Sequence, residues 1–258
     1  MKHTAGFYIN CRRDLLPNTC VRELEKGENL LKVFDILINS NDNLSCRWSN
    51  EDNFFTLEEI DFGKTKFFFN KPLGRVTTLE EMDKFFNLLN QKVASIKLIS
   101  ILGLKGKARK EVTKTLEKAI KEVFKQLNVN YEKRKSKKVQ VRYHFYLWIK
   151  DRDEIPGYIY RDLPEDNLLK MFDIIDNVSQ RWCCRWENIS GVFKLTVVQS
   201  WETGYFASNL HPIWATSLEE MDKVLEFLTS EVSLPEGISS NDELRKIVKE
   251  KMKEIGKA

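Results

Sequence analysis

The 258-residue chain lacks the segments that would place it in a membrane or in the secretory pathway. No stretch approaches the roughly 18 consecutive apolar residues that a membrane-spanning helix needs. The first residues also carry no apolar signal core. We therefore expect a chain without membrane contact that resides in the cytoplasm, or in the nucleus if the host is eukaryotic.

Cysteine is scarce, and its spacing fits neither a disulfide framework nor a metal site. The five cysteines are Cys11, Cys20, Cys46, Cys183 and Cys184, an odd number without a CxxC pair. They are typical of reduced thiols, so the sequence predicts neither a metal centre nor another cofactor.

The motifs of the common enzyme classes are missing as well. The chain has three histidines, and it has no glycine-rich phosphate loop, no HxxxH pair and no GxSxG elbow. Glu58, Glu59, Asp61 and Lys64 bring carboxylates and a lysine together, loosely as in the strand of a metal-dependent nuclease. The equivalent stretch of the second half, 196–199, has no carboxylate. We interpret the first stretch as a polar strand face and expect no catalysis by the protein alone.

The chain does contain the same pattern twice. Residues 28–48 match residues 166–186, which lie 138 positions later, at 11 of 21 positions. Residues 77–84 match residues 216–223 at seven of eight positions. Near-constant spacing of matched blocks indicates an internal duplication. We expect 1–104 to be the first repeat unit, 105–138 a basic helical connector and 139–258 the second unit with a C-terminal helix.

Periodicity predicts an α+β protein in which each unit has the order β-α-β-β-β-α and is followed by an extra helix. Apolar residues at helical spacing predict the first helix of each unit over 30–38 and 168–175. Capping boxes, Thr78 to Glu81 and Ser217 to Glu220, predict where the last helix of each unit begins. We expect the two units to be related by a pseudo-twofold axis.

Several side chains can be assigned to the core or to the surface. The repeated triplet Cys-Arg-Trp places cysteine and tryptophan on one face of a strand and Arg47 or Arg185 on the other. Asp35 and Asp173 follow a lysine by three positions and are expected to form surface ion pairs. The expected core of the two units consists of Phe34, Trp48, Met82 and Phe86, and of Phe172, Trp186, Met221 and Leu225.

Charge is concentrated in the connector. The net charge is +4, yet residues 105–142 contain 14 Lys or Arg against four Glu. On a helix, six lysines of this segment fall on one narrow side, opposite the apolar residues. A run of five basic residues follows. The helical lysines are Lys107, Lys110, Lys114, Lys118, Lys121 and Lys125, and the run consists of Lys133, Arg134, Lys135, Lys137 and Lys138.

The lysines have two interpretations. Lysines one helical turn apart can follow the phosphates of a nucleic acid, DNA or RNA, with low sequence specificity. Alternatively, Glu111, Glu117 and Glu122 neutralise them on a solvated helix face. The main functional alternative is a protein-interaction module that uses the acidic repeat bodies and the aromatic residues Trp201 and Trp214, which stand near expected loops.

Overall fold

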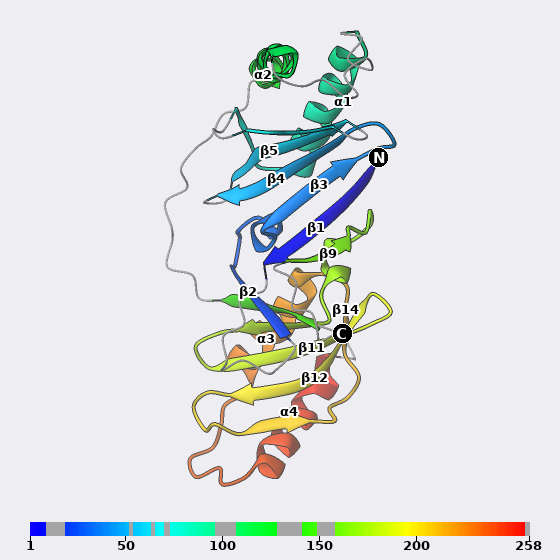
Figure 1. Ribbon diagram of the computed structural model, residues 1–258. Coiled ribbons are helices and arrows are strands. Elements are labelled where there is room, and N and C mark those ends of the chain that lie inside the picture. Colours follow the sequence, from blue (N-terminus) through cyan, green and yellow to red (C-terminus); the bar gives the residue numbers. More distant parts are fainter. Residues whose placement is uncertain are drawn as a thin grey trace. The chain divides into compact units, whose positions relative to one another are not determined.

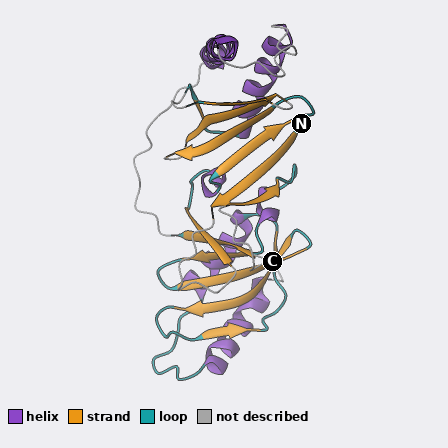
Figure 2. Cartoon of the chain, in the orientation of Figure 1, coloured by secondary structure: helices purple, strands orange, loops and turns teal. Residues whose placement is uncertain are grey.

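The computed structural model has two antiparallel sheets and, in its described part, four α-helices, so the chain is an α+β protein (Figure 2). The described residues are 1–8, 19–51, 54–62, 65–69, 73–95, 107–127, 141–148 and 158–255.

The first sheet has the strand order β6-β5-β4-β3-β1-β9, with β7 beside β5 (Figure 1). Its strands are β1 (Lys2–Tyr8), β3 (Ile36–Ser40), β4 (Ser45–Glu51), β5 (Phe54–Phe62), β6 (Thr65–Phe68), β7 (Arg75–Val76) and β9 (Tyr158–Asp162).

The second sheet has the order β13-β12-β11-β10-β8-β2, with β14 beside β12. Its strands are β2 (Thr19–Glu25), β8 (Arg142–Trp148), β10 (Ile174–Val178), β11 (Trp182–Ile189), β12 (Val192–Ser200), β13 (Phe206–Ser208) and β14 (Trp214–Ala215). The helices are α1 (Leu79–Ser95), α2 (Lys107–Leu127), α3 (Leu218–Glu231) and α4 (Asn241–Ile255).

Each sheet takes one strand from the other half of the sequence. β2 lies early in the chain but pairs with β8, from Thr19 opposite Trp148 to Glu25 opposite Arg142. β9 lies late in the chain but pairs with β1, from Thr4 opposite Asp162 to Tyr8 opposite Tyr158. The chain therefore forms two compact units, each of which includes one strand from the other half of the sequence. Unit 1 comprises 1–9, 31–135 and 156–163, and unit 2 comprises the remainder.

The predicted first helix of each unit is wrong. Leu30–Val33 and Leu168–Met171 form single turns of 3-10 helix, and the chain then continues as the strands β3 and β10. The apolar residues fit a helical period, but a short apolar segment containing Ile36, Ile38, Ile174 and Ile175 fits a buried strand equally well. β-Branched residues favour the strand. The predicted order β-α-β-β-β-α has four strands, whereas each sheet has seven, so the observed order contains three more strands.

The other predicted elements are close to the observed ones. The segment expected to be a basic helical connector contains α2, over Lys107–Leu127. The hydroxyls of Thr78 and Ser217 accept hydrogen bonds from the backbone N–H of Glu81 and Glu220. The two carboxylates reach back to the N–H of Thr77 and Thr216, so the capping boxes are present at both helices.

The predicted core is confirmed, since all eight residues assigned to it are buried. The triplet prediction also holds, because Cys46, Trp48, Cys184 and Trp186 are buried while the two arginines are not. Trp48 and Trp186 each donate the indole N–H to a buried asparagine of the neighbouring strand, at 2.9 Å in both units. These pairs satisfy polar atoms that are costly to bury alone.

Lys170 pairs with Asp166 and not, as predicted, with Asp173. The ion pair predicted for Asp35 stays a prediction. Asp35 and Asp173 have a further role at the ends of strands. Their carboxylates accept the backbone N–H of Tyr8 and Trp148, at 2.5 and 2.6 Å. Tyr8 therefore corresponds to Trp148 in the second half, whereas the offset of 138 residues between the matched blocks would equate it with Tyr146. None of the described helices has the length and apolar character of a membrane crossing.

Candidate functional site

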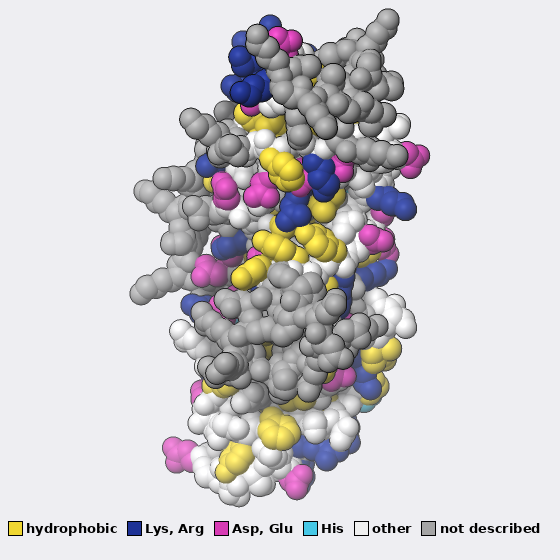
Figure 3. All heavy atoms as spheres, viewed as in Figure 1, with side chains coloured by type: hydrophobic (Ala, Val, Ile, Leu, Met, Phe, Trp, Pro, Cys, Tyr) yellow, Lys and Arg dark blue, Asp and Glu magenta, His cyan; other side chains and the backbone are white. Residues whose placement is uncertain are grey.

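The helix α2 has one buried face and one charged face, as its sequence predicts. Leu116, Ala119, Ile120 and Val123 are buried. The lysines at the other side are exposed, and Figure 3 shows Lys and Arg side chains gathered over α2. We call Lys110, Lys114, Lys118, Lys121 and Lys125 the lysine face.

The buried side of α2 is held by aromatic contacts. The ring of Phe124 lies 4.6 Å from that of Phe85 on α1 and 6.3 Å from that of Trp48 on β4, between ring centroids. Gly74 lies directly against the Phe124 ring, since a Cβ at this position would overlap it. The absence of a side chain at Gly74 thus lets the helix approach the core closely.

The acidic residues of α2 form no ion pair with the lysine face. Glu122 forms its ion pair with Lys92 of α1, at 2.9 Å between Nζ and Oε2. Lys92, and to a lesser extent Lys118, lower the pKa of the Glu122 carboxyl. Within the described residues, no carboxylate lies within 4.0 Å of any ammonium of the lysine face. The predicted pairing with Glu111 and Glu117 does not form.

Part of the predicted basic site lies outside the residues that the structure describes. Lys107 belongs to the first turn of α2, but its side chain is not among those described. The basic run, which comprises Lys133, Arg134, Lys135, Lys137 and Lys138, lies outside the described residues.

The C-terminal helix α4 is a natural comparison for α2. It follows the last helix of the second half as α2 follows that of the first, but its formal charge is +1 against +4 for α2. It also packs differently. α4 lies mainly against β13, whereas α2 lies against α1. The concentrated positive charge is thus a property of one helix and not of both.

The structure does not bring Trp201 and Trp214 together. Both are 48% exposed. Trp214 is opposite Lys194 near the start of β12, whereas Trp201 directly follows the end of this strand. At about 3.3 Å per residue, this separates their backbones by about 20 Å. The two residues are therefore available for contacts but do not form one surface.

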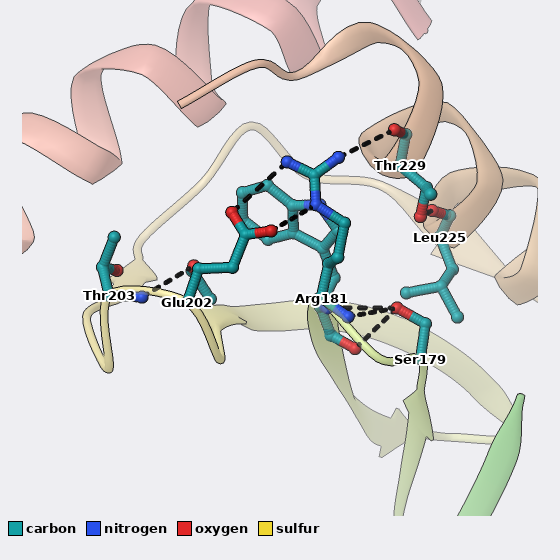
Figure 4. A network of polar contacts seen from close by, with 8 residues as sticks. Ser179, Arg181, Glu202, Thr203, Leu225 and Thr229 are labelled. Carbon is teal, nitrogen blue, oxygen red and sulfur yellow. Dashed lines mark hydrogen bonds and ion pairs between the residues drawn. The ribbon is translucent and has the colours of Figure 1, made fainter. Parts of the chain in front are cut away.

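The turn that carries Trp201 is braced by the network in Figure 4. Arg181 donates two hydrogen bonds to the Glu202 carboxylate, at 2.7 and 3.3 Å. It also donates to the Thr229 carbonyl of α3, at 3.5 Å, and its own carbonyl accepts the Trp201 N–H at 2.9 Å. Trp201 accordingly projects from a fixed turn.

The carboxylates noted on β5 do not make a metal site. Lys66 of β6 pairs with Glu59 at 2.9 Å. Among the described residues, no group of three or more histidine, cysteine, aspartate or glutamate side chains is arranged to hold an ion. Lys64, the fourth member of this set, lies outside the described residues.

Unit 2 has an open depression of about 500 Å³ between β2, the residues after it and α3. Five carboxylates and two lysines line it. Lys26 lies 3.0 Å from the Asp222 carboxylate and 3.1 Å from that of Glu226, and Asp222 is the main cause of its raised pKa. The excess of negative charge disfavours an anionic ligand such as a phosphate here.

Sequence reasoning missed a group of tyrosines on the first sheet: Tyr8 from β1, and Tyr158 and Tyr160 from β9. Their place depends on the exchanged strand, for which the sequence carries no local signal.

Comparison of the chain with protein-family models, with curated proteins and with solved structures finds no match. Function therefore rests on the chemistry of the residues themselves.

Proposed function

We propose that this chain is a non-enzymatic nucleic-acid-binding protein of low sequence specificity, and that the lysine face of α2 contacts phosphates. The observation that carries the proposal is that the five lysines of this face are exposed while no described carboxylate pairs with them. A cluster of cations that form no ion pairs on one side of a helix is costly through mutual repulsion, and a polyanion relieves that cost.

The geometry of α2 suits a sugar-phosphate backbone. Lys110 and Lys125 are 15 residues apart, which corresponds to about 22 Å along the helix axis. Duplex DNA carries one phosphate per about 1.7 Å of its axis, so several phosphates lie within reach of this face. The aromatic contacts of Phe124 keep the helix in place, which limits the ordering cost of binding.

Low specificity follows from the residue type. A lysine ammonium acts as a point charge, whereas base reading relies largely on the bidentate geometry of arginine, asparagine or glutamine. The basic run from Lys133 to Lys138 would add phosphate contacts, and we include it on its sequence alone. Such a function agrees with a cytoplasmic or nuclear location.

We also propose that the fold contains an internal duplication. We infer that the two halves arose by duplication of one unit, supported by the matched sequence blocks and by the identical tryptophan–asparagine bonds. The pseudo-twofold axis stays a prediction. The difference in charge between α2 and α4 then means that phosphate contact resides in one copy.

The test is a titration of labelled duplex DNA, duplex RNA and single strands over a series of salt concentrations. Five phosphate contacts predict a slope of roughly −4 to −5 in log K against log salt on duplex DNA. Replacing Lys114, Lys118 and Lys121 together by Gln should flatten this slope by about 2.7, at about 0.9 per contact, without lowering the melting temperature.

The matched control is on α4, where Lys246, Lys249 and Lys253 are also exposed. Their replacement by Gln removes the same charge and should leave the slope almost unchanged. The proposal is wrong if the unaltered chain shows no salt-dependent retention of DNA or RNA at about 50 mM salt, where screening is weak.

The second candidate is a protein-interaction module that uses Trp201 and Trp214, and the exposure of both rings favours it. Under this alternative the lysine changes are silent, and Trp201→Ala or Trp214→Ala abolishes capture of a protein partner.

A further inference from the structure

The first sheet has one covered face and one open face. Ala5 and Phe7 of β1 are buried on the side of α1. Since side chains alternate along a strand, Gly6 and Tyr8 belong to the opposite side, together with Tyr158 and Tyr160 of β9, which pair with them. Tyr8 is 48% exposed and Tyr160 is 44% exposed. Figure 3 shows hydrophobic side chains, with charged ones between them, over this sheet.

The rings are held in fixed positions; we call Tyr8, Tyr158 and Tyr160 the tyrosine platform. Tyr160 lies over Gly6, where an added Cβ would come within 2.9 Å of its Cε1. Tyr8 and Tyr158 meet edge to face at 5.4 Å between centroids, and Tyr158 lies 6.2 Å from Tyr160. A platform that is ordered before binding loses little entropy when a partner arrives.

A guanidinium already occupies part of this surface. The Cζ of Arg47 lies 5.7 Å from the Tyr158 ring centroid, and its Nη1 donates to the Tyr160 hydroxyl at 3.0 Å. Its Nε lies 3.6 Å from the Glu58 carboxylate. Ring faces, hydroxyl and carboxylate together are the recognition chemistry of an arginine side chain.

Among the residues that the structure describes, carboxylates outnumber cations around the platform. Burial raises the pKa of the Tyr158 hydroxyl, and Arg47 lowers it. The carboxylates of Asp35 and Glu58 raise this pKa further, which shows that both act on Tyr158. Glu59 and Asp61 lie further along the same face with Lys66, and Asp162 accepts the Thr4 hydroxyl. The local field therefore attracts cations and repels phosphates.

We propose that the tyrosine platform binds an arginine-bearing basic segment of a protein partner, whose guanidinium groups stack on Tyr8 and Tyr160 and pair with Glu58. This surface is distinct from the lysine face, and the proposal goes beyond nucleic-acid binding.

The probe is a fluorescein-labelled peptide of three Arg-Gly-Gly repeats, titrated into the full chain and followed by fluorescence anisotropy. We expect saturable binding, and a peptide of three Glu-Gly-Gly repeats should not bind. Tyr160→Leu should weaken binding about fivefold to tenfold, the loss of one partly exposed cation–π contact. Tyr160→Phe keeps the ring and should retain most of the affinity.

Two further variants test whether peptide binding depends on the tyrosine platform or only on the negative charge of the protein surface. Glu58→Gln should weaken peptide binding, while Trp214→Leu, which removes an equally exposed ring on unit 2, should not. Replacing Lys114, Lys118 and Lys121 by Gln should also leave peptide binding intact, so this proposal and the nucleic-acid proposal can fail separately.

The proposal is overturned if the Arg peptide does not bind, or if it binds Tyr160→Leu as tightly as the unaltered chain, with melting temperature confirming that this variant is folded. It is also overturned if an unstructured 12-nucleotide single strand binds instead and loses affinity in Tyr160→Leu, because the platform would then stack bases.

Discussion

The exchange of strands predicts that the two halves of the chain stay together after the chain is cut. A protease recognition sequence inserted between Leu127 and Val141 allows cleavage of the folded protein. The cut separates the sequence halves, but β2 stays paired with β8, and β9 with β1. We expect one native species that elutes from a sizing column at the volume of the uncut chain.

The magnitude follows from the registers. β2 and β8 share seven residue pairs, and β1 and β9 share five. An antiparallel ladder has on average one hydrogen bond per residue pair, each worth about 1 kcal/mol, so the two ladders contribute roughly 12 kcal/mol. Burial of Leu24 adds about 2 kcal/mol. If association costs about 6 kcal/mol, the remainder corresponds to a dissociation constant near 1 μM.

The assay is size exclusion of the cleaved protein at about 10 μM, tenfold above that constant. Leu24→Asp puts a charge into a buried site of β2 and should favour separation, whereas Glu23→Gln changes an exposed neighbour on the same strand and should not. Guanidinium chloride should release both fragments. Two separate native peaks from the unaltered cleaved chain would refute the reasoning.

Two other changes probe the packing. Gly74→Ala should displace Phe124, lower the melting temperature and weaken retention of DNA. Gly204→Ala, in a turn of unit 2 where an added Cβ would meet nothing within 4 Å, should not affect DNA retention. Burial raises the pKa of the Cys183 thiol from 9.0 to about 12, so this thiol favours the neutral form in the folded state. Its contribution to stability is complete below pH 9 and is lost between pH 9 and 12, at up to about 1.4 kcal/mol per pH unit. Cys183→Ala should make the denaturant-derived unfolding free energy fall less steeply over that range; an unchanged slope would contradict the assigned burial.

Local patterns predicted much of each unit. The capping boxes marked the starts of α1 and α3, and apolar spacing gave the core residues. These features depend on neighbours in the sequence, which is why they can be read from it. The helix predicted at 30–38 failed because seven of these nine residues are apolar, and such a segment satisfies both a helical face and a buried strand.

The exchanged strands had no such signal. Hydrogen bonds along a strand edge are made by backbone groups, which are alike in every residue, so the sequence of β2 does not reveal that it pairs with β8 rather than with β1. The tyrosine platform was missed for the same reason, since Tyr160 meets Tyr8 only through that pairing. The lysine face was found because its spacing is a property of one helix.

Unit 1 presents two charged surfaces of opposite character. α1 packs on one side of the first sheet through Phe85 and Trp48, and α2 packs on α1, so the lysine face belongs to the helical layer. The tyrosine platform lies on the other side of the sheet. The two surfaces share no residue, and the core between them is close-packed and rigid. Binding at one should therefore change affinity at the other little, since allosteric coupling requires a second arrangement that one ligand prefers. The two proposals together therefore predict that unit 1 binds a nucleic acid and a basic protein segment at the same time, on opposite sides of the first sheet.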